Sequence, residues 1–160
     1  MKIPDHLRPP LLEQLEDQED SEDCLIIRGS ALGHALLDNE EKRDYFITKF
    51  IASDEPPLEG NELGRELQAR AVGQILLKEE AEEYLSRAKE LFENELEKAL
   101  PELPEDVAID VATEPLKMAR QARSGLMENA FLRKEWDLCV NEAEHGRSII
   151  PDYLLYQPHR

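Results

Sequence analysis

The sequence has few cysteines, and their spacing excludes two common ways of stabilising a small protein. Its 160 residues contain only Cys24 and Cys139. Two thiols so far apart in the chain make neither a disulfide framework nor the ligand set of a structural zinc ion. We therefore expect reduced, buried thiols in a cytoplasmic protein. A chain of this length can form a hydrophobic core large enough to fold without such help.

Long apolar runs are also missing. No stretch approaches the roughly 18 consecutive apolar residues that a membrane-spanning helix needs. The first residues, MKIPDHLRPPLLEQ, lack the apolar core of a signal peptide. We therefore expect no association with a membrane.

Basic residues are scarce. The chain has 19 lysines and arginines against 36 aspartates and glutamates, which gives a formal net charge of -17. Residues 1–114 contain 30 of the acids and 12 of the bases, whereas residues 115–160 contain 6 and 7. Nucleic acids and anionic lipids repel such a surface, so we expect no direct binding to nucleic acid. The charge favours a partner protein with a basic surface.

Residues 1–23 are predicted to form an acidic, partly disordered N-terminal arm. The stretch LLEQLEDQEDSED follows a proline-rich start and contains no basic residue. Acidic runs of this kind are typically solvated, and the functional alternative is that they attract a basic partner. Seven acids are therefore candidate partner-binding residues: Glu13, Glu16, Asp17, Glu19, Asp20, Glu22 and Asp23.

Residues 24–160 are predicted to form a single helical domain. The clearest pattern is an apolar stripe at three- and four-residue intervals: Ala81, Tyr84, Leu85, Ala88, Leu91, Phe92, Leu96 and Ala99. This spacing is typical of a helix that packs on others through one face. We expect an all-α fold of about five helices, arranged as an irregular bundle or a stack of helical hairpins, with at most one short strand pairing.

Other helix boundaries follow from capping and breaking residues. Asp38 and Glu41 have the spacing of a capping box, which predicts a helix from residue 39. Its apolar surface comprises Tyr45, Phe46, Ile47, Phe50 and Ile51. Residues 61–100 form one long helix or two helices divided near residues 73–78. Thr113 and Pro115 begin another helical segment, with a helical hairpin or a bend near residues 132–135.

Three short segments remain open between strand and other structure. Residues 24–28 and 148–156 are apolar, and residues 106–112 alternate apolar and polar side chains. A helix is favoured for residues 24–28. The segment SIIPDYLLYQPHR is apolar and aromatic, so we expect this C-terminal tail to dock, with Tyr153 and Tyr156 as candidate partner-binding residues.

Glu142 and His145 have the Glu-x-x-His spacing of carboxylate-bridged di-iron bundles. No other histidine has a glutamate three positions before it, so half of such a site is missing. The preferred interpretation is that Trp136 and Cys139 are buried together in the core, with no metal and no cofactor. Cys139 and His145 point in different directions on one helix, which argues against a nucleophile and its base. No catalytic group is identified, so we expect no enzyme.

Lys117, Arg120 and Arg123 form the one basic stripe, at positions i, i+3 and i+6 of a predicted helix. We expect these residues to pair with carboxylates of the protein itself. Contact with a phosphate or an acidic peptide is the alternative, and all three are therefore candidate partner-binding residues.

The stretch LMENAFLRKEWDLCVNEAEHGRSIIPDY resembles the helix pair of tetratricopeptide repeats, with Ala130, Trp136, Cys139 and Pro151 at matching positions. Met127 stands where that pattern has a glycine. A weaker match ends at residue 57, and its distance from the first is not a multiple of about 34 residues. The resemblance implies helical-hairpin packing.

Two classes of function fit these features. The first is a helical protein–protein interaction module, such as an adaptor, an assembly factor or a chaperone. The alternative is an acidic inhibitor, immunity protein, antitoxin or nucleic-acid mimic that blocks a basic nucleic-acid-binding partner. Binding that depends strongly on salt would favour the second class.

Overall fold

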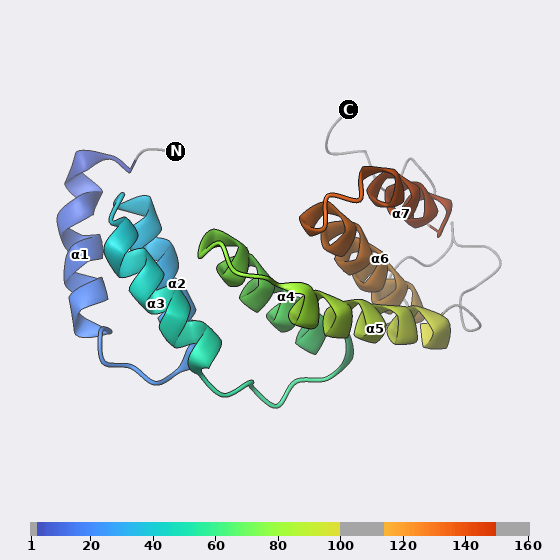
Figure 1. The fold of residues 1–160 in the computed structure, drawn as a ribbon, viewed down its shortest axis with the longest axis horizontal. Coiled ribbons are helices and arrows are strands. Elements are labelled where there is room, and N and C mark those ends of the chain that lie inside the picture. The colour runs from blue at the N-terminus through green and yellow to red at the C-terminus, as the bar shows by residue number, and fades with distance from the viewer. Residues whose placement is uncertain (1–2, 100–113, 150–160) are drawn as a thin grey trace. The chain divides into compact units, whose positions relative to one another are not determined.

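The computed structural model describes residues 3–99 and 114–149, and within these ranges all regular structure is helical (Figure 1). The all-α prediction is therefore confirmed. These residues contain a short 3-10 helix and seven α-helices rather than about five: η1 (Asp5–Leu7), α1 (Arg8–Asp17), α2 (Cys24–Leu36), α3 (Glu40–Ala52), α4 (Gly60–Leu76), α5 (Glu82–Ala99), α6 (Glu114–Leu132) and α7 (Trp136–Ile149). None of the described helices combines the length and the apolar character needed to cross a membrane.

The chain divides into two compact units. The first comprises Met1–Pro57 and Arg70–Ala81, and the second Leu58–Ala69 and Glu82–Arg160. In the first unit α1, α2 and α3 pack side by side (Figure 1). In the second unit α6 packs against both α5 and α7.

Helix α1 lies where the sequence analysis expects a partly disordered arm, and its presence is one reason for the higher number of helices. Prolines in its first turn are compatible with a helix, because the first N–H groups have no partner there. Leu15 is buried, and its methyl group lies 2.7 Å from the position that a Cβ on Gly33 would occupy. The missing side chain of Gly33 thus lets α1 approach α2 closely.

Residues 24–28 belong to α2, as the sequence analysis favours. The Asp23 carboxylate accepts hydrogen bonds from the backbone N–H groups of Leu25 at 2.9 Å and Ile26 at 3.4 Å, which caps the helix. The predicted cap of α3 at Asp38 is wrong by one residue. Asp38 adopts a left-handed conformation with φ of 58° just after α2, and Asn39 caps α3 by accepting from the Lys42 N–H.

The core of the first unit is aromatic. Phe46, Ile47 and Phe50 of α3 are buried as predicted, but Tyr45 is exposed, because it lies on the other side of Phe46 from Ile47, about 200° around the helix from Ile47. Its ring rests edge-on against Phe46 at 5.0 Å.

Arg70, on α4, is almost completely buried in this unit. Its guanidinium donates to the carbonyl oxygens of Ile51 at 3.1 Å, Ser53 at 2.9 Å and Asp54 at 3.2 Å, and lies 4.9 Å from the Phe50 ring. It thereby satisfies carbonyl groups that the end of α3 leaves without partners in the helix.

The core of the second unit is built around α5, whose predicted apolar stripe is confirmed. Phe92 is fully buried, and its ring lies between Gly64 of α4 and Gly125 of α6. A Cβ on Gly64 would meet that ring at 2.7 Å. The two glycines therefore let the three helices close around one aromatic side chain. Of the two alternatives for residues 61–100, two helices are observed in the described part, because α4 ends at Leu76 and α5 begins at Glu82.

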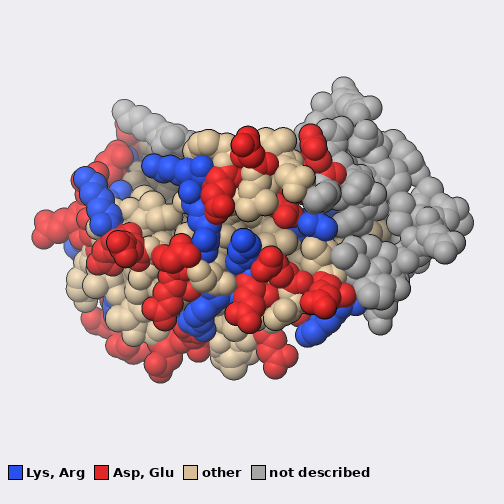
Figure 2. Space-filling view, turned by 45° about the vertical axis from the view of Figure 1, so that its right-hand side comes forward, with Lys and Arg blue, Asp and Glu red and all other residues tan. Residues whose placement is uncertain are grey.

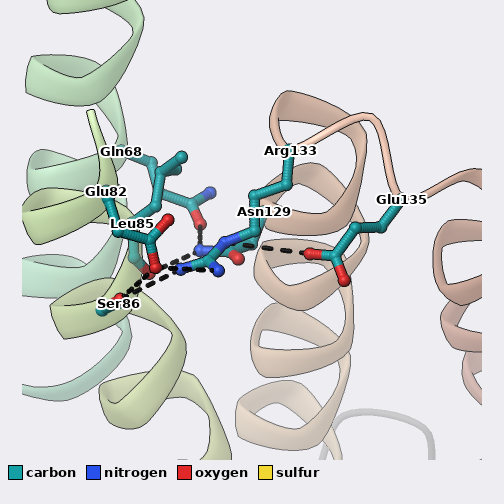
Figure 3. Close-up of polar contacts among 7 residues, drawn as sticks. All are labelled: Gln68, Glu82, Leu85, Ser86, Asn129, Arg133 and Glu135. Carbon is teal, nitrogen blue, oxygen red and sulfur yellow. Dashed lines mark hydrogen bonds and ion pairs between the residues drawn. The ribbon is translucent and has the colours of Figure 1, made fainter. Parts of the chain in front are cut away.

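A buried amide network also joins α4, α5 and α6 (Figure 3). Asn129 donates at 2.8 Å to the Gln68 side-chain oxygen and at 2.8 Å to the Leu85 carbonyl. At its edge Arg133 forms an ion pair with Glu82 at 3.1 Å and donates to Ser86 at 3.1 Å. These groups use their polar atoms to hold helices together, which favours a structural role over a catalytic one.

Candidate interaction surfaces

Helix α2 presents an apolar face to solvent. Leu25, Leu32 and Leu36 are 59%, 62% and 37% exposed, and Gly29 lies between them. The intervals of four, three and four residues match the alternating a and d positions of a helix-pairing seam. Apart from the two chain neighbours of Gly29 and the adjoining backbone of α2, no atom lies within 4 Å of the position that a Cβ on Gly29 would occupy, so the centre of this surface is open. We call these four residues the leucine face.

The opposite side of α2 is already used by its own unit. Ile27, Ala31 and His34 are buried, and the His34 ring stacks on Phe46 at 5.3 Å with an interplanar angle of 5°. Burial lowers the pKa of His34, nearby Lys42 lowers this pKa further, and Glu19 opposes the shift. A helix that is apolar all round is normally buried all round. The exposed leucine face therefore has the composition of a contact surface.

The leucine face carries no acid, although the protein has 36. Arg28 is the only Lys, Arg, Asp or Glu residue in α2, and its guanidinium lies 5.9 Å from the Phe50 ring of α3. Exposed acids bracket the helix instead. Asp20, Glu22 and Asp23 come before it, and Asp38, Glu40 and Glu41 come after it.

All seven candidate acids of the N-terminal segment are exposed. Two of them have contacts within the unit: Asp23 caps α2, and Glu19 forms an ion pair with Lys42 at 3.5 Å. Figure 2 shows acidic side chains among lysines, arginines and other residues over the described part of the surface in view. Their role in partner binding stays a prediction.

The basic stripe does not form one surface. Arg123 is largely buried and forms an ion pair with Glu142 of α7 at 2.8 Å, while exposed Lys117 lies 3.9 Å from Glu114 on its own helix. Arg120 is exposed. The expected pairing with the protein's own carboxylates is thus observed for two of the three residues.

Glu142, one of the two residues of the Glu-x-x-His motif, forms the ion pair with Arg123 that joins α7 to α6. The His145 side chain lies outside the part that the structure describes. Among the described residues, no three His, Cys, Asp or Glu side chains gather in a way that could hold a metal ion. The geometry gives Glu142 a role in helix packing.

A second exposed apolar surface lies at the turn between α6 and α7. Phe131 and Trp136 are 57% and 54% exposed, and their rings meet edge-on at 5.4 Å. Val140, one turn along α7, is exposed as well. We call Phe131 and Trp136 the aromatic pair.

The prediction that Trp136 and Cys139 are buried together is therefore wrong. Lys134 adopts a left-handed conformation with φ of 61°, and α7 begins immediately afterwards at Trp136. Side chains in a first turn lean back toward the N-terminus of their helix, so Trp136 lies over the turn, where it meets Phe131 near the end of α6 and stays exposed. Cys139 is partly buried. Of the two predicted alternatives for residues 132–135, the helical hairpin is observed, because α6 ends at Leu132 and α7 begins at Trp136 and packs against α6.

Several predicted features lie outside the described residues. Tyr153 and Tyr156 belong to residues 150–160, and the alternating segment of residues 106–112 belongs to residues 100–113. Sequence reasoning missed the leucine face, because apolar residues on a helix are ordinarily assigned to the core. The signal that could have revealed it is the absence of acids from residues 24–36 of a strongly acidic chain.

Comparison with known proteins finds no matching family model, no similar curated protein and no similar solved structure. Functional inference for this chain therefore rests on the physical character of its surfaces.

Proposed function

We propose that this protein is a non-enzymatic helical interaction module that binds another protein through the leucine face. The observation that carries the proposal is the exposure of Leu25, Leu32 and Leu36 on a helix whose other side is already packed. Contiguous apolar surface of this kind commonly marks a protein contact site. Partner binding would remove from water the parts of the leucines that remain exposed.

The test compares capture of partner proteins from an extract of the native host by the wild type and by Leu32→Glu. Val140→Glu is the matched control, because it adds the same charge at another exposed apolar position. The proposal expects a partner that the wild type and Val140→Glu retain, and that Leu32→Glu loses. It also expects that part of the captured partner stays bound when salt is raised from about 0.15 M to about 0.5 M, since apolar contacts are not screened as charges are.

The alternative function is an acidic inhibitor of a basic nucleic-acid-binding protein. It is supported by the net charge of -17 and by the exposure of all seven N-terminal acids. Under this alternative the captured partner dissociates at the higher salt concentration, and Leu32→Glu retains it. That combined result would overturn the interaction-module proposal.

A further inference from the structure

We infer that the occupant of the leucine face is an amphipathic helix of another protein, about three turns long, with lysines or arginines near both of its ends. This inference rests on the proposed function, because it names the partner of the same surface. It goes beyond that function by fixing the shape of the partner and the placement of its charge.

The length and the spacing of the leucine face define the partner as a helix. Helix α2 has 13 residues, which corresponds to a length of about 20 Å. Its exposed residues follow the a and d positions of a seam in which side chains of one helix fit between those of another. Gly29 leaves an open site between Leu25 and Leu32, into which a large apolar side chain of a partner helix can insert.

The acidic residues before and after α2 predict which charges the partner helix carries at its ends. Asp20 and Glu22 are exposed just before α2, and Glu40 and Glu41 are exposed just after the turn that follows it. A helix that lies along α2 brings both of its ends close to carboxylates. Lysine or arginine at those ends is attracted in either orientation, whereas glutamate is repelled.

The same charges argue against a second copy of this chain as the occupant. If two α2 helices pair in parallel, the acids before one helix face the acids before the other. If they pair antiparallel, the acids before one face those after the other, such as Glu22 against Glu40. Both arrangements place like charges together, which is unfavourable.

Magnitudes show why the charged ends matter. The three leucines gain only from the part of their surface that is still exposed, because they are already partly covered. A stable complex must also offset the entropic cost of association. The leucines of one short helix therefore leave a shortfall that further contacts, including those at both ends, must supply.

The test titrates the full-length chain with three fluorescein-labelled synthetic peptides of about six turns, in which a central segment of about three turns carries the tested residues, and fluorescence anisotropy follows the binding. The first peptide has leucine at the a and d positions of that segment and lysines near both ends of the segment. The second replaces these lysines with glutamates, and the third replaces the leucines with serines. We expect the first to bind, and the other two to bind at least about tenfold more weakly, which corresponds to about 1.4 kcal/mol.

Two variants separate this docking from general attraction between a basic peptide and an acidic protein. Leu32→Glu adds a negative charge, so attraction by charge alone would become stronger, whereas docking on the leucine face predicts binding about tenfold weaker. Gly29→Gln fills the open site with a residue that favours a helix more than glycine does, so it should weaken binding without loss of fold. Val140→Glu should bind as the wild type does.

A third variant tests the charged ends. This variant combines four neutral replacements of the flanking acids: Asp20→Asn, Glu22→Gln, Glu40→Gln and Glu41→Gln. It keeps Asp23, because Asp23 caps α2. We expect weaker binding of the lysine peptide and a smaller effect of salt on it.

Each result bears on a separate claim. If the lysine peptide binds Leu32→Glu and Gly29→Gln as tightly as the wild type, the leucine face is not its site and the inference is overturned. If the lysine and glutamate peptides bind equally and both require Leu32, the charge assignment is wrong while the proposed function stands. If sedimentation shows a dimer that Leu32→Glu dissociates, a second copy occupies the face and the inference is wrong. If Leu32→Glu captures the host partner as well as the wild type does, that result contradicts the proposed function, whatever the peptides show.

Discussion

Helices α2 and α5 both bury one side, but their outward sides are opposites. The outward side of α5 carries charged residues such as Glu83, Glu90 and Glu97, whereas that of α2 carries the leucine face. Their inner sides are alike in burying apolar residues, with Ile27 in α2 and Phe92 in α5 almost fully covered. The outward side therefore distinguishes a helix that only packs from a helix that can also bind a partner.

The same substitution on both helices should have the largest and the most different effects. Leu85→Glu on α5 places a charge at a buried position, and it should cost more than about 5 kcal/mol and unfold the protein. Leu32→Glu on α2 should change the free energy of unfolding by less than about 0.5 kcal/mol, because the site is exposed. Circular dichroism shows whether Leu85→Glu has lost its helices, and urea denaturation gives the free energy of unfolding of Leu32→Glu and of the wild type. Equal losses would show that the leucine face is part of a core.

The next largest effect tests the inner side of α5. Phe92→Ala should lower the free energy of unfolding by about 3 to 5 kcal/mol, because the two glycines that enclose the ring cannot fill the cavity. Urea denaturation of the wild type and of Phe92→Ala gives this difference in the free energy of unfolding. A loss below about 1 kcal/mol would mean that the three helices do not close on this ring.

The inner side of α2 should be sensitive to pH. The pKa of His34 is lowered in the folded state, so the unfolded chain takes up a proton that the folded protein resists. The stability contributed by neutral His34 is therefore complete above the ordinary histidine pKa of about 6.5, and it is lost as the pH falls toward the lower folded-state value.

His34→Phe keeps a ring that can stack on Phe46 but cannot titrate. We expect the wild type to lose more stability than this variant between about pH 8 and pH 5.5, a range that spans the ordinary histidine pKa. Urea denaturation at each pH gives the difference. The same pH dependence in both proteins would show that His34 is not responsible.

The smallest effect concerns the outward side of α5. Glu90→Gln removes one exposed charge and should change the free energy of unfolding by less than about 0.5 kcal/mol. It should also leave binding of the lysine peptide unchanged, since α5 is not its site. A clear loss of peptide binding would mean that charge anywhere on the surface is sufficient for attraction.

Periodicity predicted those parts of the fold that depend on local pattern. The stripe of α5 follows from its apolar spacing, whereas the sequence left open whether one helix or two fill residues 61–100 and whether residues 132–135 form a bend or a hairpin. Helix α1 was missed because it depends on the packing of Leu15 against Gly33 of α2, and these two residues are distant in the sequence. The exposure of Trp136 was missed because it depends on where α7 begins relative to α6.

The candidate surface was less predictable than the fold. The spacing of Leu25, Gly29 and Leu32 is visible in the sequence, but both sides of α2 are apolar. Only packing against α1 and α3 decides which side stays exposed. The predicted acids are exposed, yet Asp23 and Glu19 also have contacts within their own unit that no count of charges reveals.

The most direct measurement of the central claim is a nuclear magnetic resonance titration of the isotope-labelled full-length chain with the lysine-ended leucine peptide. We predict that the resonances of Leu25, Gly29 and Leu32 shift as the peptide is added, and that the indole resonance of Trp136, the only tryptophan, does not. A shift of the Trp136 indole with the leucine face unchanged would place the binding surface on the aromatic pair and contradict the account.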